Sequence, residues 1–299
     1  MKRVDAILLF FLFSLSCQKL SLSNEKVVIA TASNFLETLV TLKKDFESNH
    51  DIEIEIRSAS SGILYAQILR GIKVDIFLSA DEERADMIIE KKLARAGDSF
   101  IYAVGKLALW FPGSVCQLST MSRETAQECL IQSKRIGIAN EKIAPYGRAA
   151  KESLDSLGLP RTDQKLIRAE NIGQTFALGA SQNVDAAFVA MSQLKKLKGS
   201  PSYWLVESSS HAAINQKAVL LAQKKAHKGA KLFFDYLKSD DAQRRISAAG
   251  YHYQKAYLSL KNRLLFLNEG FSSVSMIFGL TAVHVMCRFQ IQAVINIAR

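Results

Sequence analysis

The sequence has little of what most catalytic and metal sites are built from. It holds four cysteines and five histidines, which are spread along 299 residues with no C-x-x-C or H-E-x-x-H spacing. It also lacks the G-x-S-x-G, P-loop and G-x-G-x-x-G patterns. These absences argue against a zinc site, a serine hydrolase and the common nucleotide sites, and they favour binding over turnover.

Proline is equally scarce, with four residues, and charged residues make up only 22%, so long disordered segments are not expected. A hydrophobic content of 48% over 299 residues is enough for more than one core. The formal net charge is +11, but the basic residues are scattered among acidic ones without an aromatic-interleaved stripe. Nucleic-acid binding is therefore not indicated, whereas a mild positive field favours an anionic ligand.

Residues 1–17 predict an export signal. Lys2 and Arg3 precede an uncharged run, Ala6–Ser16, that is too short to span a bilayer. Cys17 then follows in a loose lipoprotein cleavage box. Two interpretations stay open: a lipoprotein signal with Cys17 as the lipidated first residue, and an ordinary cleaved signal peptide. Both place the protein in the periplasm or another extracytoplasmic compartment.

Two other regions also leave alternatives open. Cys116 and Cys129 lie in one predicted loop region, where they either pair in an oxidising compartment or stay free thiols. Residues 255–299 form an unassigned apolar and basic tail. It contains the uncharged stretch Phe271–Cys287, which is short for a membrane span. An anchor, a packed helix and a frameshift product all remain interpretations of this tail.

Between these ends, short β-rich runs alternate with helical patterns. This alternation predicts an α/β fold with mainly parallel sheets, whose ligands bind where strands end and helices begin. The predicted strands are Val27–Ala30, Ile52–Ile56, Ile76–Leu78, Leu107–Phe111, Ile136–Ala139, Ala186–Val189 and Ala218–Ala222. The predicted helices are Phe35–Phe46, Ile63–Arg70, Asp81–Lys91, Gly147–Leu157, Ile172–Ala180, Gly229–Lys238 and Asp240–Ala248.

Five segments at such junctions offer hydroxyl groups, amides or open backbone N–H groups. Each has a plainer interpretation as a helix cap or a turn, and the sharper one is that the free N–H groups of a first helical turn face an anion. Arg148 is interpreted as a solvated first-turn residue. The segments are 31–35 with Ser33 and Asn34, 58–62 with Ser60 and Ser61, 144–148 with Tyr146, 170–174 with Ile172, and 188–193 with Ser192 and Gln193.

A catalytic alternative rests on the acidic cluster that begins at Asp81. Asp81 or Glu82 would act as a base in an extracytoplasmic enzyme built on the same fold. The cluster opens a predicted helix, however, and the helix dipole favours negative charge there. We therefore expect a helix-start role for these carboxylates and no enzymatic activity.

In this order, the segments resemble the molybdate/tungstate-binding proteins of bacterial ABC importers. The resemblance extends from about Val27 to Tyr253. It is carried by Ala32-Ser33-Asn34-Phe35, by Ser60-Ser61-Gly62 and by residues 74–81, 102–107, 144–150, 169–172, 187–193, 216–221 and 249–251.

The resemblance implies a two-lobed type II periplasmic-binding-protein fold with a hinge and a ligand cleft between the lobes. One lobe would take residues 26–102 plus 215–254, and the other residues 103–214. The protein would work as a monomer that captures molybdate or tungstate, with no further cofactor, and deliver it to an ABC importer permease. The contacts that carry over to this sequence are Ser33, Asn34, Ser61, Tyr146 and Ile172.

The sequence departs from the family pattern at one place. Many members have a tyrosine where this chain has Ala190 and an acid near Gln193, while Tyr146 stands where alanine is common. Tyr146 is therefore interpreted as the replacement phenol donor. Molybdate is a dianion without a proton, so its site needs donors only. Sulfate has the same requirement, and both another oxyanion and a partner-binding or signalling surface lipoprotein remain alternatives.

Overall fold

A computed structural model describes residues 25–113, 116, 121–159, 162–222 and 228–252. The strands are β1 (Glu25–Ala32), β2 (Ile52–Ala59), β3 (Ile76–Leu78), β4 (Ala94–Gly105), β5 (Leu107–Phe111), β6 (Ile136–Ala139), β7 (Leu166–Ala169), β8 (Ala186–Ala190), β9 (Ser202–Leu205) and β10 (Ile214–Leu221). The α-helices are α2 (Leu36–Asn49), α3 (Ser61–Leu69), α4 (Glu82–Glu90), α5 (Arg123–Gln132), α6 (Pro145–Leu157), α7 (Ile172–Ala180), α8 (Met191–Leu194), α9 (Lys228–Tyr236) and α10 (Asp240–Ala248).

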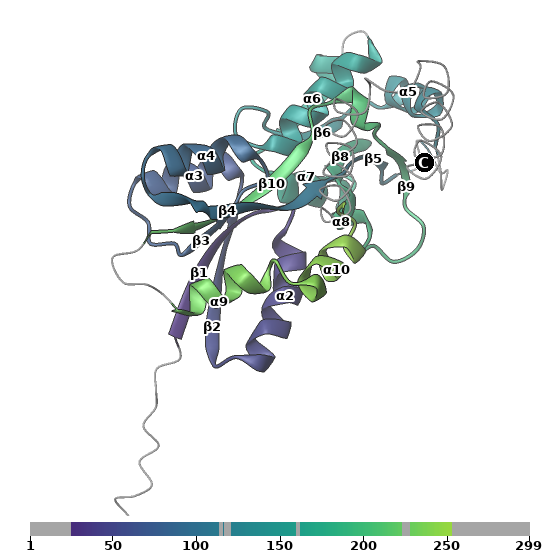
Figure 1. Cartoon of the computed structure of the whole chain (residues 1–299). Coiled ribbons are helices and arrows are strands. Elements are labelled where there is room, and N and C mark those ends of the chain that lie inside the picture. The colour runs from purple at the N-terminus through teal and green to yellow at the C-terminus, as the bar shows by residue number, and fades with distance from the viewer. Residues whose placement is uncertain (1–24, 114–115, 117–120, 160–161, 223–227, 253–299) are drawn as a thin grey trace, which may run out of the picture. The chain divides into compact units, whose positions relative to one another are not determined.

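The strands form two five-stranded sheets, in the orders β2-β1-β3-β10-β4 and β7-β6-β8-β5-β9. We call the elements around the first sheet lobe 1, which comprises β1–β4, β10, α2–α4, α9 and α10. Those around the second sheet, β5–β9 with α5–α8, are lobe 2. The chain passes between the sheets twice, from β4 to β5 and from β9 to β10, and both β4 and β10 extend toward lobe 2 (Figure 1). The predicted two-lobed α/β fold is confirmed.

The prediction of mainly parallel sheets is wrong. β1 pairs in parallel with β2 and β3, and β6 pairs in parallel with β7 and β8. β10 runs antiparallel to β3 and β4, and β5 runs antiparallel to β8 and β9. The antiparallel strands are those next to the two crossings, where the chain enters each sheet from the other lobe and not through a βαβ unit.

Helices cover both faces of the first sheet. One face is covered by α2, α9 and α10. The side chains that pack there include Phe35, just before α2, and Leu39, Leu42 and Phe46 of α2. The other face is covered by α3 and α4. Spacings of three and four residues between buried positions place these apolar side chains on one side of α2, as the sequence predicts. The layered packing holds the ends of β1, β2 and β3 in fixed positions at the lobe junction.

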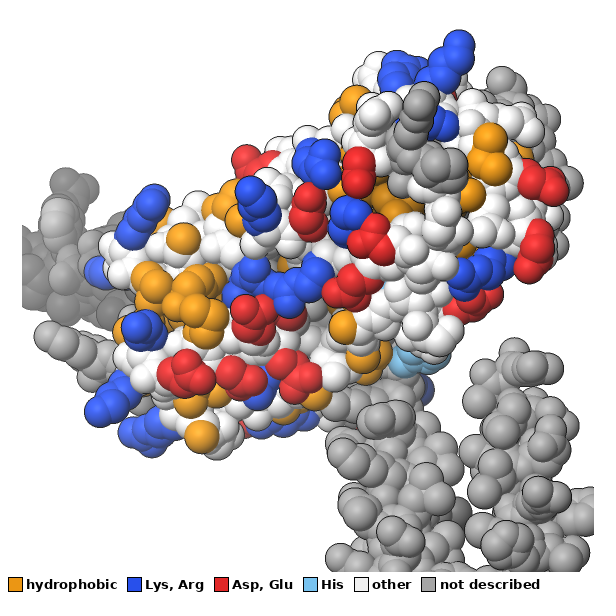
Figure 2. All heavy atoms as spheres, turned by 90° about the horizontal axis from the view of Figure 1, so that it is seen from above, with side chains coloured by type: hydrophobic (Ala, Val, Ile, Leu, Met, Phe, Trp, Pro, Cys, Tyr) orange, Lys and Arg blue, Asp and Glu red, His pale blue; other side chains and the backbone are white. Residues whose placement is uncertain are grey.

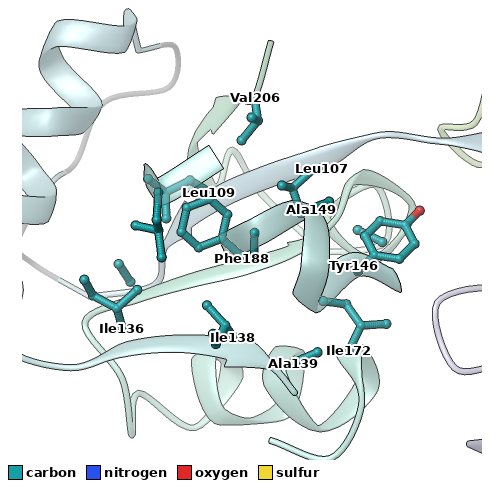
Figure 3. Packing of buried hydrophobic residues seen from close by; sticks show 14 of the residues in the cluster. Leu107, Leu109, Ile136, Ile138, Ala139, Tyr146, Ala149, Ile172, Phe188 and Val206 are labelled. Carbon is teal, nitrogen blue, oxygen red and sulfur yellow. The ribbon is translucent and has the colours of Figure 1, made fainter. Parts of the chain in front are cut away.

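In lobe 2, apolar side chains from β5, β6 and β8 pack against α5 and α6 (Figure 3). Leu109, Ile136, Ile138 and Phe188 belong to this cluster. Tyr146 lies at its edge, and its hydroxyl group points away from the aliphatic side chains. The core of lobe 2 therefore buries the ring of Tyr146 and leaves the oxygen directed out of the apolar cluster.

Cys116 and Cys129 form a disulfide, with 6.0 Å between their Cα atoms. The sequence left a disulfide and two free thiols as alternatives, and the structure has the disulfide. The predicted signal at residues 1–17, Cys17 and the tail 255–299 lie outside the described residues. Within the described part of the chain, no helix is long and apolar enough to cross a membrane.

Candidate anion site at the lobe junction

The two lobes meet at helix N-termini. The amide of Gly62, in the first turn of α3, donates a 2.9 Å hydrogen bond to the carbonyl of Ile143 in the loop before α6. The amide of Gly173, in the first turn of α7, donates to Ser33 Oγ at 3.2 Å. Ala32 and Ala80 of lobe 1 belong to the same buried cluster as residues of lobe 2. The three helix starts at α3, α6 and α7 therefore lie around one junction.

Ser33 and Asn34 follow the end of β1, as predicted, but neither caps the next helix. The N-cap of α2 is Phe35, which makes no side-chain capping bond. Ser33 is partly buried and accepts the bond from Gly173. Asn34 is buried, and its Nδ2 donates to Gln216 Oε1 at 2.9 Å and to the Tyr251 hydroxyl at 3.3 Å. The capping interpretation of this pair is wrong, and both side chains face the lobe junction.

Ser61 is the first residue of α3 and is fully buried. Its Oγ accepts a 2.9 Å hydrogen bond from the amide of Ala80. Ser60 is the N-cap residue, yet its side chain makes no capping bond and its buried Oγ has no hydrogen-bond partner in the described structure. Buried hydroxyl groups are normally satisfied, so the start of α3 retains unused hydrogen-bonding capacity.

Tyr146 is the second residue of α6, and Pro145 before it fits the first helical position because its fixed φ suits the helix. The ring is 1% exposed. The hydroxyl oxygen accepts a 3.1 Å hydrogen bond from Gln216 Nε2 of lobe 1. Burial raises the pKa of Tyr146 well above its ordinary value, so the phenol keeps its proton at neutral pH.

Ile172 is the first residue of α7 and is buried. The helix is capped by Asn171, whose Oδ1 accepts from the amide of Gln174 at 3.1 Å. The Ile172 carbonyl accepts from Gln193 Nε2 at 3.2 Å. The first turn of α7 is thus held by side chains on both sides, with Gly173 directed to Ser33.

The end of β8 does not replace the missing tyrosine. Gln193 Oε1 accepts from the amide of Ala190 at 3.0 Å, so both ends of this amide are bound within lobe 2. Ser192 Oγ donates to the carbonyl of Asn34 at 3.3 Å, which is a contact between the lobes. Ser192 therefore joins the two lobes, and Gln193 joins the end of β8 to the start of α7 within lobe 2.

Three hydroxyl groups at the junction share one feature. The oxygens of Ser33, Ser61 and Tyr146 each accept a hydrogen bond from a protein N–H group. A hydroxyl whose oxygen already accepts keeps its own proton free to donate. The three therefore suit a ligand that offers only acceptors.

Sequence patterns missed three residues of this region. Gln216, Tyr102 and Tyr251 are buried, and they join Asn34 and Tyr146 in one hydrogen-bonded network. The sequence holds one signal that could have identified Gln216. This residue stands between Ile214 and Ala218 on the inward face of β10, where a polar side chain needs a buried partner.

The acidic cluster behaves as a helix start. Asp81 caps α4 by accepting from the amide of Arg84 at 3.2 Å, and it also forms an ion pair with the Arg84 side chain. Glu82 accepts from Asn215 at 2.7 Å. Arg148 is partly exposed and pairs with Glu83 across the junction at 2.9 Å. No group of three or more histidine, cysteine or acidic side chains that could hold a metal ion occurs among the described residues.

A cavity of about 560 Å³ opens beside the junction. Ser33 and Asn34 line it, together with Asn171 and Gly173 from the start of α7. Ser61, Tyr146 and Ile172 do not line it, because they are buried where the lobes are in contact. The cavity therefore reaches Ser33 and Asn34, whereas the other three predicted contacts are buried outside its lining.

The chain is similar to known solute-binding proteins over most of its length. Residues 27–252 match the family model described as bacterial extracellular solute-binding protein. The molybdate-binding protein ModA of Azotobacter vinelandii is 34% identical over 235 residues, covering 77% of this chain and 90% of that protein. ModA of Rhodobacter capsulatus is 33% identical over 229 residues, covering 76% and 88%.

A solved structure gives the same relationship in three dimensions. The periplasmic molybdate-binding protein of Azotobacter vinelandii superimposes with a TM-score of 0.68 at 33% sequence identity. The match covers 76% of this chain and 98% of that one.

Proposed function

Because the chain belongs to the bacterial extracellular solute-binding protein family, we propose that it captures molybdate outside the cytoplasm and delivers it to an ABC importer permease. The relatives of 33–34% identity that carry the name molybdate-binding protein support this substrate. Tungstate has the same tetrahedral shape and charge, so the proposal includes it as a second ligand. The role is binding and release, without chemical turnover and without a further cofactor.

The observation that carries the proposal is the state of the three hydroxyl groups. The oxygens of Ser33, Ser61 and Tyr146 each accept a hydrogen bond from a protein N–H group, so each hydroxyl has a proton to give. Molybdate at neutral pH is a dianion that can only accept. The helix starts at α3 and α7 add partial positive charge, which stabilises an anion without a counter-ion.

The lobes supply these groups from both sides. Ser33, Asn34 and Ser61 belong to lobe 1, and Tyr146 and Ile172 belong to lobe 2. We propose these five residues as the oxyanion contacts, with Ile172 contributing its backbone N–H. An anion bound between them would favour the closed arrangement, because its contacts with one lobe are complete only when the other lobe is in place.

The exported form follows from the same proposal. We infer that the mature protein is a monomer in the periplasm or on the outer side of the membrane. If Cys17 is lipidated, the lipid would hold it at the membrane surface near its permease. An intact mass of the exported protein tests this point: the mass of a diacylated or triacylated Cys17 supports the anchor, and a lipid-free mature chain contradicts it.

The test of function is ligand binding by the purified mature chain. Thermal unfolding is followed with molybdate, tungstate, sulfate and phosphate, and the dissociation constants are then measured by calorimetry. A ligand at a hundred times its dissociation constant adds about 2.7 kcal/mol to the free energy of unfolding. Stabilisation by molybdate and tungstate alone supports the proposal. Stabilisation by sulfate or phosphate alone overturns the substrate, and no response to any of them favours a partner-binding lipoprotein.

A further inference from the structure

We propose that Gln216 is a positioning residue that sets the direction of the Tyr146 hydroxyl proton, so that this phenol donates to the bound oxyanion and not to Gln216. The inference rests on the proposed oxyanion-binding function. Gln216 lies on β10 of lobe 1 and is completely buried, whereas Tyr146 belongs to lobe 2. The 3.1 Å bond between them therefore also joins the lobes at the site.

The first step of the argument is the direction of the Tyr251 hydroxyl. Tyr251 donates its single proton to the backbone carbonyl of Asn34 at 2.9 Å. A backbone carbonyl can only accept, so the proton is committed to it. The Tyr251 oxygen is then an acceptor. The groups within reach are the side-chain amide of Asn34 at 3.3 Å and the hydroxyl groups of Ser192 and Thr38. The Asn34 atom that faces this oxygen must be Nδ2 and not Oδ1.

The second step carries this direction to Gln216. With Nδ2 of Asn34 facing Tyr251, its other proton points to Gln216 at 2.9 Å, and the facing atom must be the acceptor Oε1. The Tyr102 hydroxyl donates to the same Oε1 at 2.9 Å. In the flipped orientation of the Asn34 amide, Oδ1 would face two oxygen atoms, the Tyr251 hydroxyl oxygen and Gln216 Oε1, and neither would donate a proton to it. Two donors thus fix the Gln216 amide with Nε2 toward Tyr146.

The third step is the consequence for Tyr146. Because Nε2 donates to the phenol oxygen, the Tyr146 proton is directed away from Gln216. Space also confines this hydroxyl: a Cβ atom on Gly105 would lie 2.2 Å from the Tyr146 oxygen and 2.9 Å from Gln216 Nε2. The absence of a side chain at Gly105, where β4 ends at the crossing to lobe 2, is what admits the hydroxyl. Gln216 therefore leaves the phenol proton available to a ligand, while Asn34 Oδ1 is a buried acceptor of the same network without a hydrogen-bond partner among the described residues.

An oriented donor costs less free energy to use than a freely rotating one, since the site does not have to reorganise when the anion binds. A hydrogen bond to a charged group contributes enough to change affinity by about ten- to a hundredfold. Part of this affinity would depend on Gln216, which acts through Tyr146 and does not contact the anion itself.

The experiment combines variants at the two positions. Molybdate affinity is measured by calorimetry for the wild type, Gln216→Met, Tyr146→Phe and the double variant. Methionine keeps the length of glutamine but has no amide. We expect Gln216→Met to weaken binding about tenfold, and to have almost no effect when Tyr146 is already phenylalanine. Equal losses in both backgrounds, or no loss in either, would overturn the proposal.

A spectroscopic readout separates orientation from general damage. The near-ultraviolet difference spectrum on anion binding reports a phenol that begins to donate to a negative charge. It should be present in the wild type, absent in Tyr146→Phe and strongly reduced in Gln216→Met at saturating molybdate. A full wild-type difference spectrum in saturated Gln216→Met would count against an orienting role.

Two further variants serve as a control and as a second test. Gln243 is another buried glutamine of lobe 1, and its Nε2 donates to the carbonyls of Tyr102 and Leu237. Gln243→Met should lower stability but leave molybdate affinity within about twofold. If Gln216→Met does not fold, Gln216→Glu tests the same point. Its carboxylate would accept a hydrogen bond from the Tyr146 hydroxyl and repel the anion, so unchanged affinity in that variant would reject the inference. If the wild type itself does not bind molybdate or tungstate, the proposed function fails, and that result is distinct from failure of the positioning role.

Discussion

The amide of Gly62 and the carbonyl of Ile143 form a 2.9 Å hydrogen bond that joins the first turn of α3 in lobe 1 to the loop before α6 in lobe 2. The approach is so close that a Cβ atom on Gly62 would lie 2.9 Å from the same carbonyl oxygen and 3.1 Å from the Ile143 Cα atom. Both neighbours are backbone atoms, which cannot turn aside as a flexible side chain can. The closed junction therefore requires a glycine at this position.

Gly62→Ala is accordingly predicted to hold the lobes slightly apart and to weaken oxyanion binding about tenfold or more, because the contacts from both lobes can no longer be made together. Calorimetry with molybdate measures the effect. Gly97→Ala is the matched control, since nothing lies within 4 Å of the added Cβ there. Equal affinities of the two variants would show that closure does not depend on this contact.

Ser61→Ala is predicted to affect both binding and stability. It removes a proposed ligand donor, and it leaves the buried amide of Ala80 without its 2.9 Å partner. We expect affinity to fall about tenfold or more and the free energy of unfolding to fall by about 1–3 kcal/mol. Ser153→Ala removes another fully buried serine hydroxyl, which donates to the Ala149 carbonyl within α6. That control should change stability alone; a similar loss of affinity in both variants would remove Ser61 from the site.

Alkaline pH is predicted to destabilise the protein through its buried tyrosines. Burial raises the pKa of Tyr102 and Tyr146 well above the ordinary value and that of Tyr251 to about 12. In the unfolded chain these phenols ionise near pH 10, while in the folded protein they keep their protons. Their contribution to stability is thus complete below about pH 10 and is lost as the pH rises further, by about 1.4 kcal/mol per pH unit for each phenol.

Thermal unfolding between pH 9 and pH 11.5 measures this loss. Tyr146→Phe should reduce the steepness of the decline, because one of the protonated phenols is gone. Tyr65→Phe serves as the control, since Tyr65 is only partly buried on α3 and lies outside the network around Gln216. A decline of the same steepness in Tyr146→Phe and in the wild type would contradict the assignment.

The disulfide is predicted to stabilise lobe 2 without contributing to the site. Cys116 and Cys129 are 13 residues apart, and closing a loop of about this length contributes roughly 3 kcal/mol. For a protein of this size that corresponds to a fall in melting temperature of roughly 6–12 °C on removal. The double variant Cys116→Ala, Cys129→Ala is compared with the wild type, with and without a reductant. Molybdate affinity should be unchanged because no proposed contact lies on α5, and a reductant should lower the melting temperature of the wild type alone.

Several elements could be predicted from the sequence because their signals are local. The strands at Ile76–Leu78, Leu107–Phe111 and Ile136–Ala139 and the helices at Ile172–Ala180 and Asp240–Ala248 have the predicted bounds, since apolar periodicity and turn residues mark both ends. The loops that carry the proposed contacts could also be identified, because hydroxyl and small residues between a strand and a helix are visible in the chain itself. The long strand Ala94–Gly105 was missed, since its first residues are mostly polar or exposed.

The alternation of strands and helices can be read from the sequence, and it establishes the α/β class and the loops where a ligand could bind. Only the folded chain shows which strands run antiparallel, that Cys116 and Cys129 pair, and that Ser192 and Gln193 bind protein groups. It also placed Gln216 of β10 beside Tyr146, 70 residues earlier in the chain. The reason is physical: periodicity records which side of an element is buried, but the direction of a buried hydrogen bond depends on partners that only folding brings together.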